Sequence, residues 1–95
     1  MIQLYKNLPT LDLHGLDREY ARILINDFIK DNYQLKNKQV IIIHGNGTGV
    51  IKKTTQQTLK KNKFVEEFHI DNFNDGMTIV SIRKNPWLFR VFLLL

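Results

Sequence analysis

The most constraining feature of this sequence is a run of β-branched residues that leads directly into a glycine-rich loop. Residues 38–44 read Lys-Gln-Val-Ile-Ile-Ile-His, and a nearly continuous apolar run of this length is typical of a strand buried on both faces. Glycines follow at alternate positions from 45 to 49, and a helix is predicted from Val50 to about Asn62. A strand that runs into a crossover helix indicates an α/β fold with parallel pairing.

The remaining segments complete a βαβαββ order. A short strand is predicted from Thr10 to Leu13 and a helix from Asp17 to about Gln34. Residues 64–70 and 77–83 read as two further strands, and the turn formers of 72–76 between them are few enough for a hairpin. We therefore expect a two-layer sandwich with a mixed four-stranded sheet. The first helix is expected to turn its apolar stripe to the core: Tyr20, Ile23, Leu24, Phe28 and Ile29.

Length and composition limit the classes of protein that are compatible with this chain. Its 95 residues are enough for one small domain, which we place at residues 10–84, with an N-terminal extension at 1–9. The absence of cysteine excludes disulfides, thiolate metal clusters and cysteine nucleophiles. No secretory signal is apparent at the amino end, so we expect a cytoplasmic protein.

Residues 85–95 form an apolar C-terminal tail, interrupted only by Arg90. The tail is much shorter than the roughly 20 residues that cross a bilayer, so no membrane association is expected. We expect it to cover an apolar face, either in this chain or in a partner subunit of a homo-oligomer.

The charge of the chain is +5, and the cations gather in its middle. No acidic residue occurs between Asp31 and Glu66, while this stretch contains seven lysines. Such a block favours a polyanionic partner, although lysines that only solvate a small domain would give the same total.

The first candidate motif is Leu11-Asp12-Leu13-His14-Gly15, at the end of the first predicted strand. Side chains alternate along a strand, so Asp12 and His14 are expected on one face, within reach of each other. A carboxylate can orient an imidazole and raise its basicity, and such a pair can move a proton from a hydroxyl group. The alternative is that Asp12 caps a turn and His14 is an ordinary polar residue.

The second candidate motif is the loop that follows the buried strand. Its residues are His44, Gly45, Asn46, Gly47, Thr48 and Gly49. Glycines let backbone amides approach a ligand closely, and the next helix directs its positive dipole end at the same place, so a phosphate is the expected ligand. The spacing differs from that of Walker and dinucleotide-binding loops. A tight turn that needs glycine for geometry alone is the alternative.

Lys52 and Lys53 lie in the first turn of the second predicted helix, where the helix dipole disfavours cations, so an anion is expected nearby. Asp12, His14 and His44 match no familiar metal-ligand spacing, and no dedicated metal site is predicted. His69 has no evident partner and is expected to be structural.

Together, Leu11-Asp-Leu-His-Gly15 and Ile43-His-Gly-Asn-Gly-Thr-Gly49 resemble the two motifs of the small MutS-related (Smr) domain family. The resemblance covers about residues 10–84 and implies a fold similar to the carboxyl domain of translation initiation factor three. It also implies DNA nicking or RNA cleavage. Asp12 and His14 correspond to the family's acid–histidine pair. Lys52 stands where cleaving members tend to carry arginine, and lysine lacks the planar fork that grips phosphate with two bonds.

The leading hypothesis is a nucleic-acid-binding endonuclease in which Asp12, His14 and Lys52 are catalytic. The glycine loop and Lys53 would bind the nucleic acid. RNA cleavage through the ribose 2′-hydroxyl needs no metal, whereas DNA nicking would call for a divalent cation. The alternative is a non-catalytic module that binds structured RNA, branched DNA or ribosomal RNA, with the ribosome as a partner.

Overall fold

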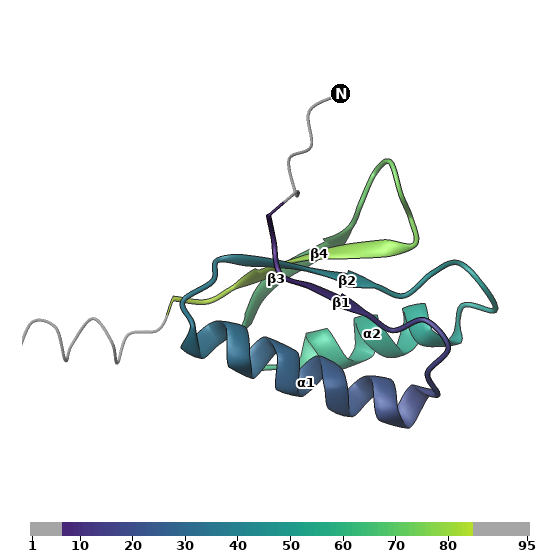
Figure 1. Ribbon diagram of the computed structural model, residues 1–95, viewed down its shortest axis with the longest axis horizontal. Coiled ribbons are helices and arrows are strands. Elements are labelled where there is room, and N and C mark those ends of the chain that lie inside the picture. The colour runs from purple at the N-terminus through teal and green to yellow at the C-terminus, as the bar shows by residue number, and fades with distance from the viewer. Residues whose placement is uncertain (1–6, 85–95) are drawn as a thin grey trace, which may run out of the picture.

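The computed structural model describes residues 7–84, which form the predicted βαβαββ order (Figure 1). The elements are β1 (Thr10–Asp12), α1 (Arg18–Gln34), β2 (Gln39–Ile43), α2 (Val50–Lys61), β3 (Val65–Ile70) and β4 (Met77–Ile82). The expected tail at 85–95 and the extension at 1–6 lie outside the described residues. No helix between residues 7 and 84 has the length and apolar composition needed to cross a membrane.

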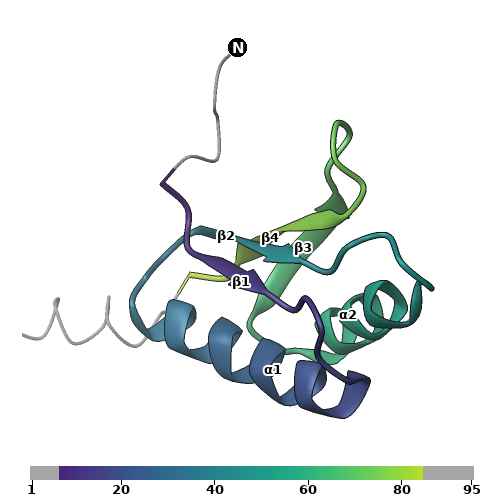
Figure 2. The same ribbon diagram turned by 45° about the vertical axis from the view of Figure 1, so that its right-hand side comes forward.

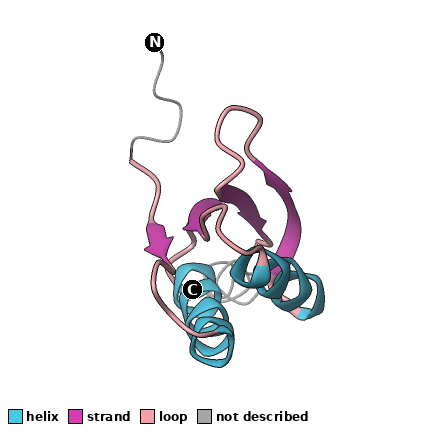
Figure 3. Ribbon diagram, turned by 90° about the vertical axis from the view of Figure 1, so that its right-hand side faces the viewer, coloured by secondary structure: helices cyan, strands magenta, loops and turns pink. Residues whose placement is uncertain are grey.

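The sheet is mixed and four-stranded, with the order β1-β2-β4-β3. β1 pairs with β2 in parallel, while β4 runs antiparallel to both β2 and β3. Both helices pack on the same face of the sheet, so the domain has two layers (Figure 3). The prediction of a two-layer sandwich with a mixed sheet is confirmed.

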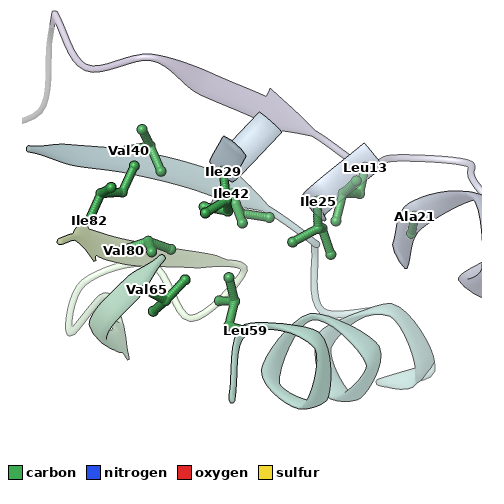
Figure 4. Close-up of a cluster of buried hydrophobic side chains, with 10 residues drawn as sticks. All are labelled: Leu13, Ala21, Ile25, Ile29, Val40, Ile42, Leu59, Val65, Val80 and Ile82. Carbon is green, nitrogen blue, oxygen red and sulfur yellow. The ribbon is translucent and has the colours of Figure 1, made fainter. Parts of the chain in front are cut away.

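The core fills the space between the sheet and the helices (Figure 4). β2 and β4 contribute Val40, Ile42 and Val80, each with no exposed surface. These side chains meet Ile25 and Ile29 of α1, which are also fully buried. Burial of each such side chain stabilises the fold by about 1.5–3 kcal/mol.

The buried face of α1 agrees with the predicted stripe only in part: Ile29 is buried, and Leu24 and Phe28 pack partly buried against the core. The fully buried apolar positions are Ala21, Ile25 and Ile29, whereas Tyr20 is 51% exposed and Ile23 is 50% exposed. Apolar residues occur on more than half of the helix circumference, so their spacing fits two faces. The observed face includes the small side chain of Ala21, which lies among the buried residues of the core.

The ends of α1 are closed by local hydrogen bonds. At its start, Asp17 accepts a 2.8 Å hydrogen bond from the Tyr20 backbone N–H. At its end, the amides of Lys36 and Asn37 donate to the carbonyls of Tyr33 and Asn32, the pattern of a Schellman motif. Lys36 has a left-handed φ of 65°, a conformation that favours glycine.

This strain predicts that Lys36→Gly stabilises the domain. Glycine removes the Cβ penalty of the left-handed conformation, and we expect a gain of about 1 kcal/mol in the free energy of unfolding. Chemical denaturation of the two proteins measures the difference, with Lys38→Gly as a control outside the motif. A loss of stability in Lys36→Gly would contradict the prediction.

Candidate functional site

The two sequence motifs meet at one edge of the sheet because β1 and β2 are parallel neighbours. Asp12 pairs with Ile43, and the Leu13 amide donates a 2.8 Å hydrogen bond to the Ile43 carbonyl. The segments that follow these strands, from His14 and from His44, therefore leave the sheet side by side (Figure 2). This is the edge where open α/β sheets bind ligands.

The first motif forms a tight turn that Asp12 holds in place. Its Oδ1 accepts a 2.9 Å hydrogen bond from the backbone N–H of His14, and the turn ends β1 one residue earlier than predicted. Within residues 7–84 no hydrogen bond joins the carboxylate to the His14 ring, so Asp12 positions His14 through the backbone. Both side chains are exposed and accessible to a ligand, while Leu13 between them is buried.

The ring of His44 is built into the sheet. Only 7% of the residue is exposed. Its Nδ1 lies 3.0 Å from the Gly45 carbonyl oxygen and its Nε2 lies 2.8 Å from Thr78 Oγ1. A carbonyl can only accept, so Nδ1 carries the proton and the Thr78 hydroxyl donates to Nε2. The ring thus fastens the loop to β4, and the nucleic-acid contact that we predict for His44 stays a prediction.

The surroundings of His44 keep its ring neutral. Burial lowers the pKa below its usual value of 6.5, and the positive charge of Lys52 acts in the same direction. The hydrogen bond to Gly45 and the charge of Asp75 oppose this shift without cancelling it. The neutral ring is the form in which Nε2 can accept the Thr78 hydrogen bond.

The lowered pKa predicts acid sensitivity of the loop. As the pH falls, the His44 ring of the unfolded chain takes up a proton near pH 6.5, whereas the folded ring takes one up only at a lower pH. The free energy of unfolding therefore decreases as the pH falls from 6.5 through the folded pKa. NMR titration of the His44 ring should give a midpoint below 6.5, and chemical denaturation should show stability falling below that pH. His44→Gln should reduce the fall, whereas His69→Gln should retain it. A His44 midpoint at or above 6.5 would overturn this assignment.

The glycine loop rests against the start of β4. The amides of His44 and Gly45 both donate to the Gly76 carbonyl, at 2.9 and 2.8 Å. Asn46 adds a 2.6 Å hydrogen bond to the Asp75 carboxylate. A Cβ on Gly76 would lie 3.3 Å from the Gly45 Cα, so glycine at 76 permits this close approach. We had interpreted Gly76 only as a turn former.

Replacement of Gly76 is therefore expected to be costly, whereas replacement of Gly47 is not. Gly76→Ala should lower the free energy of unfolding by about 1–3 kcal/mol, because the loop must move away. Gly47→Ala should change it by less than about 0.5 kcal/mol, since its Cβ would meet no atom within 4 Å. Thermal or chemical denaturation checks both. Equal effects would mean that the two loops are not held in contact.

The start of α2 is open to an anion. Its N-cap is Gly49, with a left-handed φ of 86° and no side chain of its own, and the Val50 amide donates a long 3.4 Å hydrogen bond to the Thr48 hydroxyl. The first turn contains no acid and includes Lys52 and Lys53. In α1, by contrast, the carboxylate of Asp17 occupies the equivalent place. At such a helix start, backbone amides and the helix dipole act together on an anion, and the phosphate site stays a prediction.

A cationic groove of about 600 Å³ runs between α1 and α2. Arg18 and Val50, the first residues of the two helices, line it, so it opens at the same sheet edge as the two motifs. Sequence reasoning missed Arg18 and Arg22 as candidates. The predicted topology could have indicated them, because helices that follow parallel neighbouring strands lie side by side. One carboxylate lines the groove, that of Glu19, which pairs with Arg22 at 2.8 Å. Four cations line it: Arg18, Arg22, Lys53 and Lys61.

Two other expectations concern histidines and metals. His69, which we expect to be structural, lies on β3 opposite Ile79 and is exposed. No group of three histidine or acidic side chains in the described part of the chain is arranged to hold a metal ion.

These features define a small α/β domain in which an acid–histidine turn, a glycine loop and two helix starts lie at one edge of a mixed sheet. The Smr domain family model matches residues 11–83. The chain therefore belongs to the Smr domain family.

Several curated relatives carry the name endonuclease MutS2. The chain is 40% identical to the Geobacillus sp. (strain WCH70) protein over 72 residues, which are 76% of this chain and 9% of that protein. It is 35% identical to the Caldanaerobacter subterraneus protein over 79 residues, 80% of this chain and 10% of that protein. The chain thus spans about a tenth of the length of these relatives.

Solved structures agree with the fold. The Smr domain of Thermus thermophilus MutS2 matches with a TM-score of 0.77 and 25% identity, covering 80% of this chain and 99% of that one. YdaL, a stand-alone small MutS-related protein from Escherichia coli, matches with a TM-score of 0.74 and 21% identity, covering 79% and 64%.

Proposed function

We propose that this Smr domain binds nucleic acid and cleaves RNA at the edge where its two motifs meet. The observation that carries the proposal is the juxtaposition, through the Leu13–Ile43 hydrogen bond, of an exposed histidine with a glycine loop and a helix start that has a glycine cap and no acid in its first turn. An imidazole supplies proton transfer, and amides with lysines supply anion binding. The name of the MutS2 relatives, endonuclease, is consistent with this chemistry.

In the proposed reaction, the His14 ring takes the proton from a ribose 2′-hydroxyl. The oxygen attacks the adjacent phosphorus, the bond from phosphorus to the 5′-oxygen breaks, and that oxygen takes a proton from water. The protonated His14 ring then returns its proton to the solvent. The products are a 2′,3′-cyclic phosphate and a 5′-hydroxyl end. The loop amides and Lys52 stabilise the charge that develops on the phosphoryl oxygens.

Binding extends beyond the reacting phosphate in this proposal. The groove between α1 and α2 opens at the site and is lined by four cations, so it offers a path for the phosphates that flank the cleaved bond. The Arg22 charge is partly offset by Glu19. We therefore assign the larger share of phosphate attraction to Arg18, Lys53 and Lys61.

A second candidate is a non-catalytic module that binds structured nucleic acid. Two observations favour it: Lys52 lacks the planar fork of arginine, and the Asp12 carboxylate bonds the His14 backbone rather than its ring. In this case the same surface binds without cleaving. DNA nicking would need water as the nucleophile and a divalent metal to activate it.

Cleavage of an end-labelled structured RNA in excess EDTA tests the proposal. We expect the wild-type protein to release fragments that end in a cyclic phosphate and His14→Ala to release none, because the proton acceptor is lost. His69→Ala is the matched control and should cleave like wild type. If wild type and His14→Ala leave the RNA intact but shift it equally on a gel, the binding module is correct. Nicking of DNA only with added Mg²⁺ would also overturn the RNA reaction.

Two Asp12 variants separate the roles of its charge and its turn. Asn keeps an oxygen that can accept from the His14 amide, whereas Ala removes it. We expect Asp12→Ala to lower the cleavage rate by about 10- to 100-fold through misplacement of His14, and Asp12→Asn to recover most of it. Equal losses in both variants would assign the effect to the carboxylate charge.

A further inference from the structure

The loop between β3 and β4 carries the most exposed aromatic side chain of the described residues. Phe73 is 98% exposed, compared with 51% for Tyr20. An apolar ring left in water forgoes the stabilisation that burial would bring. The hairpin that carries it projects from the sheet beside the glycine loop (Figure 1).

The exposure of Phe73 is built on a defined loop. The Asp71 Oδ2 accepts hydrogen bonds from the amides of Phe73, at 3.3 Å, and Asn74, at 2.9 Å. The side chain of Asn74 in turn accepts from the Gly76 amide at 3.0 Å. These bonds set the course of the backbone on both sides of the ring.

The same loop is attached to the phosphate-binding edge. Gly76 accepts from the amides of His44 and Gly45, and Asp75 accepts from Asn46 of the glycine loop. The loop that carries the ring is therefore hydrogen-bonded to the loop that we assign to phosphate. A strand held there by its phosphates brings its bases to the surrounding surface.

We propose that Phe73 stacks on an unpaired base of the bound strand; this inference rests on the proposed function and adds a base subsite to it. Every nucleobase has a flat apolar face and polar edges, and base–aromatic stacking tolerates any sequence. The loop offers both kinds of group, because the neighbours of Phe73 in the sequence, Asn72 and Asn74, are exposed polar residues. A single ring among polar groups is too small an apolar area for a protein interface.

Fluorescence quenching of 2-aminopurine, placed in turn along a single-stranded oligoribonucleotide, tests this subsite. We expect wild type to quench strongly at one position. Phe73→Ala should abolish this quenching and weaken binding by about 5- to 100-fold, with no change in thermal stability. Phe73→Trp should retain the quenching and the affinity of the wild type, whereas Phe73→Leu should lose both because leucine has no aromatic face. Leu35→Ala, at another exposed apolar residue, should behave like wild type.

An abasic residue at the quenched position completes the test. The penalty of Phe73→Ala should disappear on the abasic strand, since the ring has nothing to stack on. An equal penalty on both strands would overturn the subsite while leaving nucleic-acid binding intact. Failure of wild type to bind any oligonucleotide would instead overturn the proposed function. Loss of anionic vesicle binding in Phe73→Ala, with oligonucleotide binding unchanged, would assign the ring to a membrane and contradict the proposal.

Discussion

Parallel pairing of β1 with β2 is the constraint on which the candidate site depends. Parallel neighbours end at the same edge, so the hydrogen bond from Leu13 to Ile43 brings two motifs 30 residues apart in sequence to one place. The same pairing requires a crossover helix between the strands, and a second helix follows β2 on the same face. The starts of both helices therefore lie beside the site, where their dipoles favour negative charge.

The two helix starts use that dipole differently. In α1 the carboxylate of Asp17 satisfies an amide, so the helix is complete without a ligand. In α2 the cap is Gly49, and the first turn contains Lys52 and Lys53 in place of the acids that would stabilise an isolated helix. The cost to α2 is offset elsewhere, through the buried Thr55, Thr58 and Leu59 on its inner face. The domain thus concentrates unsatisfied positive potential at one helix and not at the other.

The order of elements, the mixed sheet and the buried strand β2 were predictable because the hydrophobic period changes clearly along the chain. The buried face of α1 was not, since its apolar residues fit two faces and only packing chooses Ala21 and Ile25. The contact between the His44 ring and Thr78 was not predictable either, because the two residues lie 34 positions apart and no local pattern indicates that contact. For Asp12 the sequence allowed either a turn cap or a partner for the His14 ring, and the backbone geometry selects the cap.

The sheet order has a consequence for how copies of the domain behave toward one another. Among residues 7–84, β1 and β3 are the edge strands, and an exposed edge offers unpaired amides and carbonyls to any other strand. β1 is only three residues long, and β3 carries Glu66 and Glu67 at an irregularity in its register. A short edge on one side and a charged, interrupted edge on the other both resist continuous strand pairing between molecules. The fold therefore limits sheet-to-sheet aggregation without closing its sheet into a barrel.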